Sequence, residues 1–214
     1  MDDPERARIY PYSDAPRLPQ GDRVDPRAIV GAGESSIELE IGPGRGGFIW
    51  ERLNSGSNVR IIGLEIRRKW ATLVDRKLEE AGLAARGRVF AEDAKLALPR
   101  FPEACISRAY VHFPDPWWKK RHAKRLVAQQ ELVTQMERLL IDGGEFFVQT
   151  DVEERAGLYE RLFDGSKLMQ PWPNGPRVSD PEFGARSPRE RRAMSDGLPI
   201  IRLRYLRCPR SEST

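Results

Sequence analysis

Apolar and polar positions alternate along several short stretches of the chain, and glycine or charged residues end each stretch. The run from Ile37 to Ile41 alternates in this way and passes directly into the glycine-rich stretch 42–47. Apolar residues then recur at helical spacing. The pattern predicts a strand, a glycine turn and a helix in succession.

The same order of strand and helix repeats along the chain. Further extended runs lie at 59–64, 88–91, 106–113, 145–150 and 200–205. Apolar residues at helical spacing lie at 70–81, from about 125 to 140, and up to about 163. The two glycines at 143–144 are expected to end the second of these helices. This alternation predicts an α/β fold with a doubly wound, mostly parallel sheet, whose ligands bind beyond the carboxyl ends of the strands.

The two ends of the chain differ in character. Residues 1–35 are rich in Pro, Asp, Arg and Gly and show no sustained periodicity, so we expect a loosely held N-terminal arm. Residues 36–214 are expected to form one domain, because 214 residues with 39% hydrophobic composition suit one core. Pro and Gly dominate 171–184, which is interpreted as a loop before the last strand.

Composition narrows the class of protein. The 36 Lys and Arg exceed the 32 Asp and Glu only slightly, so charge is a weak hint of a polyanionic partner. Cys105 and Cys208 lack the spacing of a structural zinc site or a disulfide framework, which fits a reducing compartment. No apolar stretch approaches the roughly 18 residues that cross a bilayer. We therefore expect a soluble cytoplasmic protein.

The glycine turn indicates a cofactor site but leaves its identity open. A glycine turn between a strand and a helix lets backbone amides approach an anionic or carboxylate-bearing ligand. Gly42 and Gly44 satisfy the dinucleotide-binding pattern together with Gly47, and the pattern common among methyltransferases together with Gly46.

Acidic residues mark the ends of the predicted strands. Glu65 follows the second strand and is suited to accept hydrogen bonds from a ribose diol with either cofactor. Asp93 follows the third strand, where a carboxylate in an adenosylmethionine site would accept a hydrogen bond from the adenine amino group. Glu40, beside the turn, is a candidate to face the sulfonium end of that cofactor.

The segment from His112 to Arg125 combines prolines, aromatic rings and cations. Pro114 and Pro116 end the fourth strand and restrict Asp115 between them. The two tryptophans that follow offer surfaces on which an extruded base can stack, and the five Lys and Arg residues at 119–125 suit phosphates.

The two histidines of the chain, His112 and His122, lie in the same segment. They lack the spacing and the partners of a metal pair. We therefore expect each to have a structural or RNA-contacting role, and no metal is required.

The run FPDPWWKKRHAKR resembles the signature of the tRNA (guanine-N7)-methyltransferases of the TrmB type. The resemblance spans about 36–205 and includes ELEIGPGRGGF, IIGLEIR, AEDA and QTD. It implies a Rossmann-like class I S-adenosylmethionine-dependent methyltransferase that methylates N7 of a guanine in the tRNA variable loop. It also implies tRNA as partner, no membrane, and a monomer or homodimer.

Matching to the family motifs assigns roles to individual residues. Adenosylmethionine binding is implied for Glu40, Gly42, Gly44, Glu65, Asp93 and Asp115. The position of Asp115 is also regarded as catalytic in that family. Substrate contact is implied for Lys119, Asp151, Ser187 and Glu190. The last two depart from the family's Thr-x-x-Glu, because Ser187 replaces the Thr and Pro188 lies within the motif.

Three alternatives explain part of the pattern. A methyltransferase acting on an exocyclic amine would also place a proline-bounded acid after the fourth strand. An RNA-binding module that lost its chemistry would retain the fold, and a nicotinamide oxidoreductase would use the glycines. Product analysis, cofactor binding without turnover, and cofactor competition distinguish these alternatives.

Overall fold

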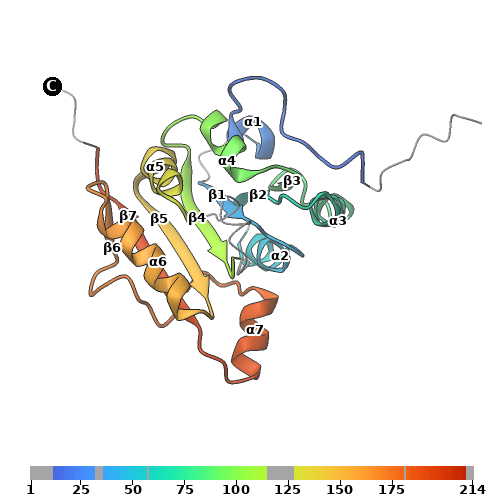
Figure 1. Cartoon of the computed structure of the whole chain (residues 1–214). Helices are drawn as coiled ribbons and strands as arrows, with labels where there is room; N and C mark the ends of the chain where they lie inside the picture. Colours follow the sequence, from blue (N-terminus) through green and yellow to red (C-terminus); the bar gives the residue numbers. More distant parts are fainter. Residues whose placement is uncertain (1–11, 32–35, 57, 115–127, 181, 211–214) are drawn as a thin grey trace, which may run out of the picture.

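The computed structural model describes residues 12–31, 36–56, 58–114, 128–180 and 182–210. Within them, seven strands form one sheet in the order β3-β2-β1-β4-β5-β7-β6 (Figure 1). The strands are β1 (Ile37–Ile41), β2 (Arg60–Leu64), β3 (Gly87–Phe90), β4 (Ile106–His112), β5 (Leu140–Thr150), β6 (Met169–Pro171) and β7 (Ile201–Arg207). The helices are α1 (Pro26–Val30), α2 (Gly47–Asn54), α3 (Arg68–Glu80), α4 (Ala94–Ala97), the 3-10 turn η1 (Leu98–Arg100), α5 (Gln130–Leu139), α6 (Glu153–Asp164) and α7 (Pro188–Ser195).

Strand direction confirms the predicted fold class. The first five strands pair in parallel, whereas β7 runs antiparallel to β5 and to β6. The chain builds outward from β1 through β2 to β3, and then returns to the other side of β1 with β4 and β5. This reversal of strand order between β1 and β4 opens a crevice at their carboxyl ends, where doubly wound proteins bind ligands.

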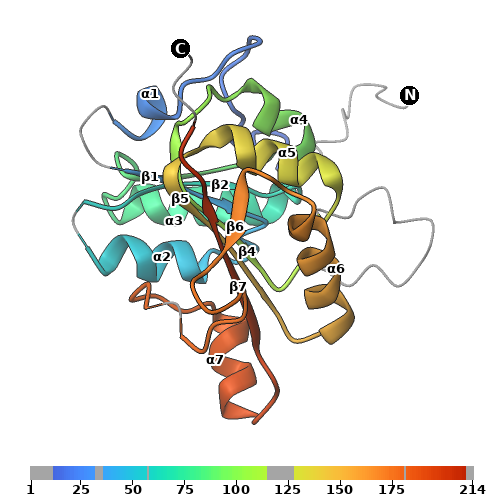
Figure 2. The same ribbon diagram turned by 90° about the vertical axis from the view of Figure 1, so that its left-hand side faces the viewer.

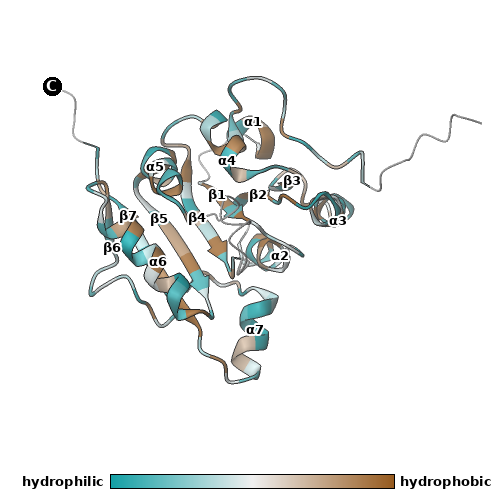
Figure 3. Ribbon diagram, in the orientation of Figure 1, coloured by the Kyte–Doolittle hydropathy of each residue, from teal (hydrophilic) through white to brown (hydrophobic). Residues whose placement is uncertain are grey.

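The sheet is covered on both faces (Figures 1 and 2). One apolar cluster joins the sheet to α1, α4, α5 and α6, and a second joins it to α2 and α3. Figure 3 shows the hydrophobic residues concentrated on the strands and on the inner sides of the helices. In β1 the alternate residues Ile37, Leu39 and Ile41 enter the first cluster, so Glu38 and Glu40 face the second.

The boundary between α5 and β5 differs from the prediction. The helix ends at Leu139, and Leu140 is already extended and buried at the start of β5. The glycines at 143–144 therefore lie within the strand and do not end the helix. Gly143 has φ +71°, and the pairing register between β4 and β5 shifts between Ile106 and Arg108. Glycine tolerates this backbone without strain.

The prediction of a loose arm is wrong for residues 12–31. Leu18, Val24 and Val30 are buried in the first apolar cluster. The backbone is also paired, because Pro16 O accepts from Ala91 N at 2.7 Å and Val24 N donates to the carbonyl of Arg100 at 2.9 Å. These partners lie about 75 residues away along the chain, so no local periodicity indicates them.

The sequence analysis missed the helix α7. Ser187 is its N-cap and accepts from Glu190 N at 3.1 Å, and Pro188 occupies the first turn. The pattern Ser-x-x-Glu is a known start signal for helices, so the information was present in the sequence. A Cβ on Gly47 would lie 2.2 Å from Pro188 Cγ. The helix therefore packs against the start of α2, directly after the glycine turn.

Candidate functional site

A cavity of about 860 Å³ opens at the carboxyl ends of β1 to β4. It is lined by the ends of these strands, by α4, and by parts of α5 and α6. Four of the sequence-predicted or chemically notable residues line it: Gly42, Glu65, Asp93 and His112. The structure thus brings the ends of four successive strands to one cavity, as expected for the switch point of this fold.

The glycine turn forms one wall of the cavity. Gly42 and Gly44 have φ +74° and +56°, in the left-handed region that favours glycine. Apart from its two neighbours in the chain, no atom of the described residues lies within 4 Å of the place where a Cβ would stand on Gly42, so the described residues leave the space beside it open. Gly46 differs, because Val74 would clash with its Cβ at 2.3 Å. The first glycines therefore offer close approach to a ligand, whereas Gly46 serves packing.

Glu65 links the glycine turn to the end of β2. Its side chain is buried, and Oε2 accepts from Gly44 N at 2.9 Å. Oε1 accepts from the backbone N and from Nε of Arg67, at 2.9 and 3.1 Å. The carboxylate thus fixes the turn. Its predicted contact with a ribose stays a prediction.

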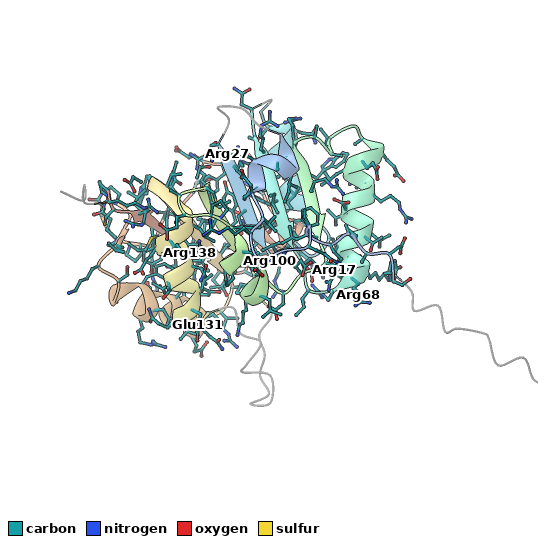
Figure 4. All side chains as sticks on the ribbon, turned by 90° about the horizontal axis from the view of Figure 1, so that it is seen from above. Arg17, Arg27, Arg68, Arg100, Glu131 and Arg138 are labelled. Atoms are coloured by element: carbon teal, nitrogen blue, oxygen red, sulfur yellow. The ribbon has the colours of Figure 1, made fainter. Side chains whose placement is uncertain are left out.

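Asp93 lies at the end of β3 and begins α4. Its Oδ1 accepts from Lys95 N at 3.0 Å, which caps the helix. The neighbouring Glu92 accepts from Leu18 N at 3.2 Å and pairs with Arg17 at 3.6 Å. The N-terminal segment is therefore attached to Glu92, which lines the cavity beside Asp93. Figure 4 shows Arg138 and Glu131 on α5, which borders the cavity from the other side of α4.

Three of the residues assigned to the substrate, Asp151, Ser187 and Glu190, lie at the end of β5 and in the first turn of α7. Asp151 follows β5, and its Oδ2 accepts from Arg189 of α7 at 2.8 Å. Ser187 caps α7 and is buried. Glu190 is also buried and pairs with Arg186 and Arg202, each at 2.8 Å. In this structure Ser187 and Glu190 thus hold α7 in place, and their predicted contact with substrate stays a prediction.

Two predicted site residues, Asp115 and Lys119, lie outside the described residues, as does His122. The residues that lead to Asp115 are described. Phe113 has φ +45°, a strained value for an aromatic residue, and its N donates to Gln149 O at 2.7 Å. Strained backbone of this kind concentrates at functional sites.

Charged side chains cross the sheet in a row that the sequence analysis missed. Glu38 of β1 accepts from Arg52 at 2.7 and 2.9 Å and from the Tyr110 hydroxyl at 3.0 Å. Arg108 lies 3.6 Å from Glu38 and 3.4 Å from Glu145, which also pairs with Arg204 at 2.7 Å. We call these residues the ion-pair row: Arg52, Glu38, Arg108, Glu145 and Arg204.

A second row lies nearer the carboxyl ends of β1, β4 and β5, two residues beyond Glu38 on β1 and four residues beyond Arg108 and Glu145 on β4 and β5. It comprises Glu40, His112 and Gln149, and we call it the polar tip row. Glu40 Oε1 lies 2.8 Å from His112 Nδ1. Glu40 Oε2 and both side-chain amide atoms of Gln149 are buried and have no hydrogen-bond partner within the described part of the chain. Such atoms are costly to bury.

Residues 12–31, 36–56, 58–114, 128–180 and 182–210 contain neither a metal-binding cluster nor a membrane span. In these ranges no three or more His, Cys, Asp or Glu side chains gather in an arrangement that could hold a metal ion. No helix in them combines the length and the apolar composition of a membrane span.

Comparison with known proteins identifies the family of this chain. Residues 34–202 match the model of the family described as "Putative methyltransferase". The chain is 35% identical over 173 residues to a tRNA (guanine-N(7)-)-methyltransferase of Myxococcus xanthus, covering 80% of this chain and 83% of the relative. It is also 35% identical over 185 residues to a protein of the same name from Anaeromyxobacter dehalogenans, covering 86% and 91%.

Solved structures add the fold. A geranyl diphosphate C-methyltransferase from Streptomyces coelicolor, solved with Mg²⁺, geranyl diphosphate and S-adenosyl-L-homocysteine, superposes with a TM-score of 0.57. The match covers 82% of this chain and 72% of that one at 14% identity, so it shows the fold alone. The sequence relatives go further: this chain belongs to the tRNA (guanine-N(7)-)-methyltransferase family.

Proposed function

We propose that this protein transfers a methyl group from S-adenosylmethionine to N7 of a guanine in the variable loop of a tRNA. The observation that carries the proposal is the cavity at the ends of β1 to β4, which combines an open glycine turn with carboxylates at successive strand ends. The names of the relatives supply the substrate class. The reaction fits a cytosolic enzyme, and we propose that it acts as a monomer or a homodimer.

The residues present fit adenosylmethionine. The open space beside Gly42 leaves room for a ligand against the backbone, and the cavity volume of about 860 Å³ is within the range of cofactor sites. Asp93 lines the cavity with a carboxylate suited to the adenine amino group. The unpartnered Oε2 of Glu40 suits a cationic group. We therefore assign Glu40, Gly42, Gly44, Glu65 and Asp93 to cofactor binding.

In this reaction the main task of the protein is to align N7 of the guanine with the methyl group of the cofactor. When bound, the cofactor supplies an electrophilic methyl group on a sulfonium. N7 of guanine carries a lone pair at neutral pH, so the protein does not have to remove a proton first. Holding the base in line contributes up to about 7–11 kcal/mol in well-oriented sites. We propose that Asp115 orients the guanine and stabilises the positive charge that it acquires, and that Lys119 contacts the RNA.

Asp151 is proposed as the second anchor for the guanine. It lies at the end of β5, next to the strand that leads to Asp115. Its ion pair with Arg189 joins it to α7, and the Arg189 guanidinium also lies 5.3 Å from the Phe113 ring. Ser187 and Glu190 would then act on the substrate side by holding α7 beside Asp151.

The decisive experiment is transfer of labelled methyl from adenosylmethionine to unmodified tRNA, followed by nucleoside analysis. We expect label in 7-methylguanosine and a loss of at least about a hundredfold in Asp115→Asn, because a charged group beside the reacting base is removed. Asp164→Asn, which alters an exposed acid on α6, is the matched control and should retain full activity.

The same assay discriminates the alternatives. Label in an exocyclic N-methyl product would replace the proposal with another base methyltransferase. Adenosylmethionine binding without transfer to any tRNA would favour an RNA-binding module. Displacement of adenosylmethionine by a nicotinamide dinucleotide would favour an oxidoreductase.

A further inference from the structure

Glu38 and Glu40 of β1 have different surroundings, although both are buried on the same face of the sheet. Both oxygens of Glu38 accept from cationic or hydroxyl donors of the protein. Glu40 has one partner, His112, and its Oε2 has none within the described residues. The protein thus pairs both oxygens of the first carboxylate, whereas one oxygen of the second has no partner among the described residues.

His112 is itself held firmly. Its ring lies among three aromatic rings, with centroid distances of 4.2 Å to Phe48, 5.7 Å to Tyr110 and 5.8 Å to Phe147. Only 5% of its side chain is exposed. Because a carboxylate oxygen can only accept, Nδ1 is the donor to Glu40 Oε1. The fixed ring therefore fixes the orientation of the Glu40 carboxylate.

We propose that His112 is a positioning residue, which holds Glu40 so that its second oxygen receives the α-ammonium group of the methionine part of adenosylmethionine. The inference rests on the proposed function and deepens it. The ammonium is preferred to the sulfonium because it carries N–H donors, which an unpartnered carboxylate oxygen requires, whereas a sulfonium carries none. Ile41, which follows Glu40 in the chain, and His112, its hydrogen-bond partner, both line the cavity.

The position of His112 in the chain adds a second consequence. It is the last residue of β4, three residues before Asp115. Its hydrogen bond to Glu40 ties the end of β1, which carries the cofactor turn, to the end of β4, which leads to the proposed catalytic residue. Loss of this bond should therefore affect cofactor affinity first, and the KM for adenosylmethionine more than kcat.

The experiment separates hydrogen bonding from packing with two variants of His112. His112→Phe retains a ring among Phe48, Tyr110 and Phe147 but removes the donor. His112→Asn places an amide donor near the position of Nδ1 but loses the ring. Binding of S-adenosylhomocysteine and of methylthioadenosine is measured by calorimetry on each folded variant. The first ligand has the ammonium and no sulfonium, and the second has neither the ammonium nor the carboxylate.

We expect His112→Phe to weaken S-adenosylhomocysteine roughly tenfold, the size of one hydrogen bond to a charged group. Methylthioadenosine should bind unchanged, and His112→Asn should restore most of the lost affinity. Glu40→Gln should reproduce the loss. In turnover, KM for adenosylmethionine should rise roughly tenfold in His112→Phe with kcat changed less than threefold.

Three results would overturn the inference. Full affinity in His112→Phe together with loss in His112→Asn would make the role one of packing. Equal weakening of methylthioadenosine would show a general disturbance of the site, and weakening of adenosylmethionine alone would assign Glu40 to the sulfonium. A wild-type protein that binds none of these ligands would instead overturn the proposed function, so the two failures are distinguishable.

Discussion

The ion-pair row and the polar tip row lie on the same face of β1, β4 and β5, and the polar tip row is two residues further along β1 and four residues further along β4 and β5. Two residues along a strand correspond to about 7 Å. In the ion-pair row each carboxylate of Glu38 and Glu145 contacts two guanidinium groups. In the polar tip row, Glu40 and Gln149 retain buried atoms without partners in the described residues. We therefore interpret the ion-pair row as stabilising the sheet and propose that the polar tip row takes part in binding.

This division has a physical basis. A buried carboxylate is tolerated when cations and hydroxyl groups surround it, and such a network then fixes one arrangement of the sheet. Buried donors and acceptors without a partner at a cavity instead destabilise the free protein, and they can form hydrogen bonds with a bound ligand. Natural proteins accept such local costs at functional sites. The comparison therefore predicts opposite effects for similar substitutions in the two rows.

The largest effect is expected in the ion-pair row. Glu38→Gln retains the shape of the side chain but leaves Arg52 and Arg108 without their shared carboxylate. Removing one member of a buried ion pair costs about 3–5 kcal/mol. Urea denaturation should show this loss in the free energy of unfolding, while S-adenosylhomocysteine affinity of the folded variant stays near that of wild type. Glu79→Gln on the exposed face of α3 is the control, and a loss below 1 kcal/mol in Glu38→Gln would contradict the structural role.

The opposite sign is expected for Gln149→Leu. The amide is buried and unpartnered in the described part of the chain, so a similar-sized apolar side chain should raise the free energy of unfolding by about 1–2 kcal/mol. Gln170→Leu, at an exposed position of β6, is the matched control and should change stability by less than about 0.5 kcal/mol. Destabilisation by Gln149→Leu would mean that the amide has a partner, and the two rows would then be alike.

The smallest effect concerns the hydroxyl of Tyr110. Burial, and then the neighbouring Glu38 carboxylate, raise the pKa of Tyr110 well above its ordinary value of 10.0. Above about pH 10 the unfolded tyrosine ionises while the folded one retains its proton, so the folded state binds more protons. Tyr110 therefore makes its full contribution to the free energy of unfolding below about pH 10. This contribution decreases as the pH rises further.

Tyr110→Phe tests this directly. At neutral pH it should cost about 1 kcal/mol, the value of one hydrogen bond. Between about pH 9 and pH 11 the variant should lose less stability than wild type, because it lacks the Tyr110 hydroxyl, whose pKa is raised in the folded state. Denaturation curves across this range measure both quantities. If the free energies of unfolding of the two proteins decrease in parallel with pH, Tyr110 ionises normally and the ion-pair row is open to water.

Much of the fold was predictable because its signals are local. The alternation of apolar and polar residues predicted the parallel strands, and the glycine turn predicted the start of α2. The helix α7 was predictable in principle from its Ser-x-x-Glu start, but the same residues matched a family motif and were interpreted only as substrate contacts. The N-terminal segment was not predictable, since its backbone partners belong to β3 and η1.

The candidate site likewise has features that the sequence predicted and features that it did not. Gly42, Glu65 and Asp93 follow strand ends, and parallel strands bring their carboxyl ends to one edge, so the sequence predicted that they meet. It did not predict that Glu65 would fix the glycine turn through Gly44 N, or that Glu190 would be buried between two arginines. Both contacts depend on side chains that only the folded chain places within reach.

By itself, the sequence determined the class of fold, the cofactor-type turn and the family, because these depend on short patterns that any folded copy must present. It assigned a role to Glu40 beside the glycine turn, but none to Glu38, which occupies an equivalent position in the same alternating strand. The tertiary structure shows how the surroundings of the two glutamates differ. Arg52 and Arg108 reach the first glutamate, and His112 reaches one oxygen of the second. A buried carboxylate's role is set by the donors around it, and those donors come from other parts of the chain.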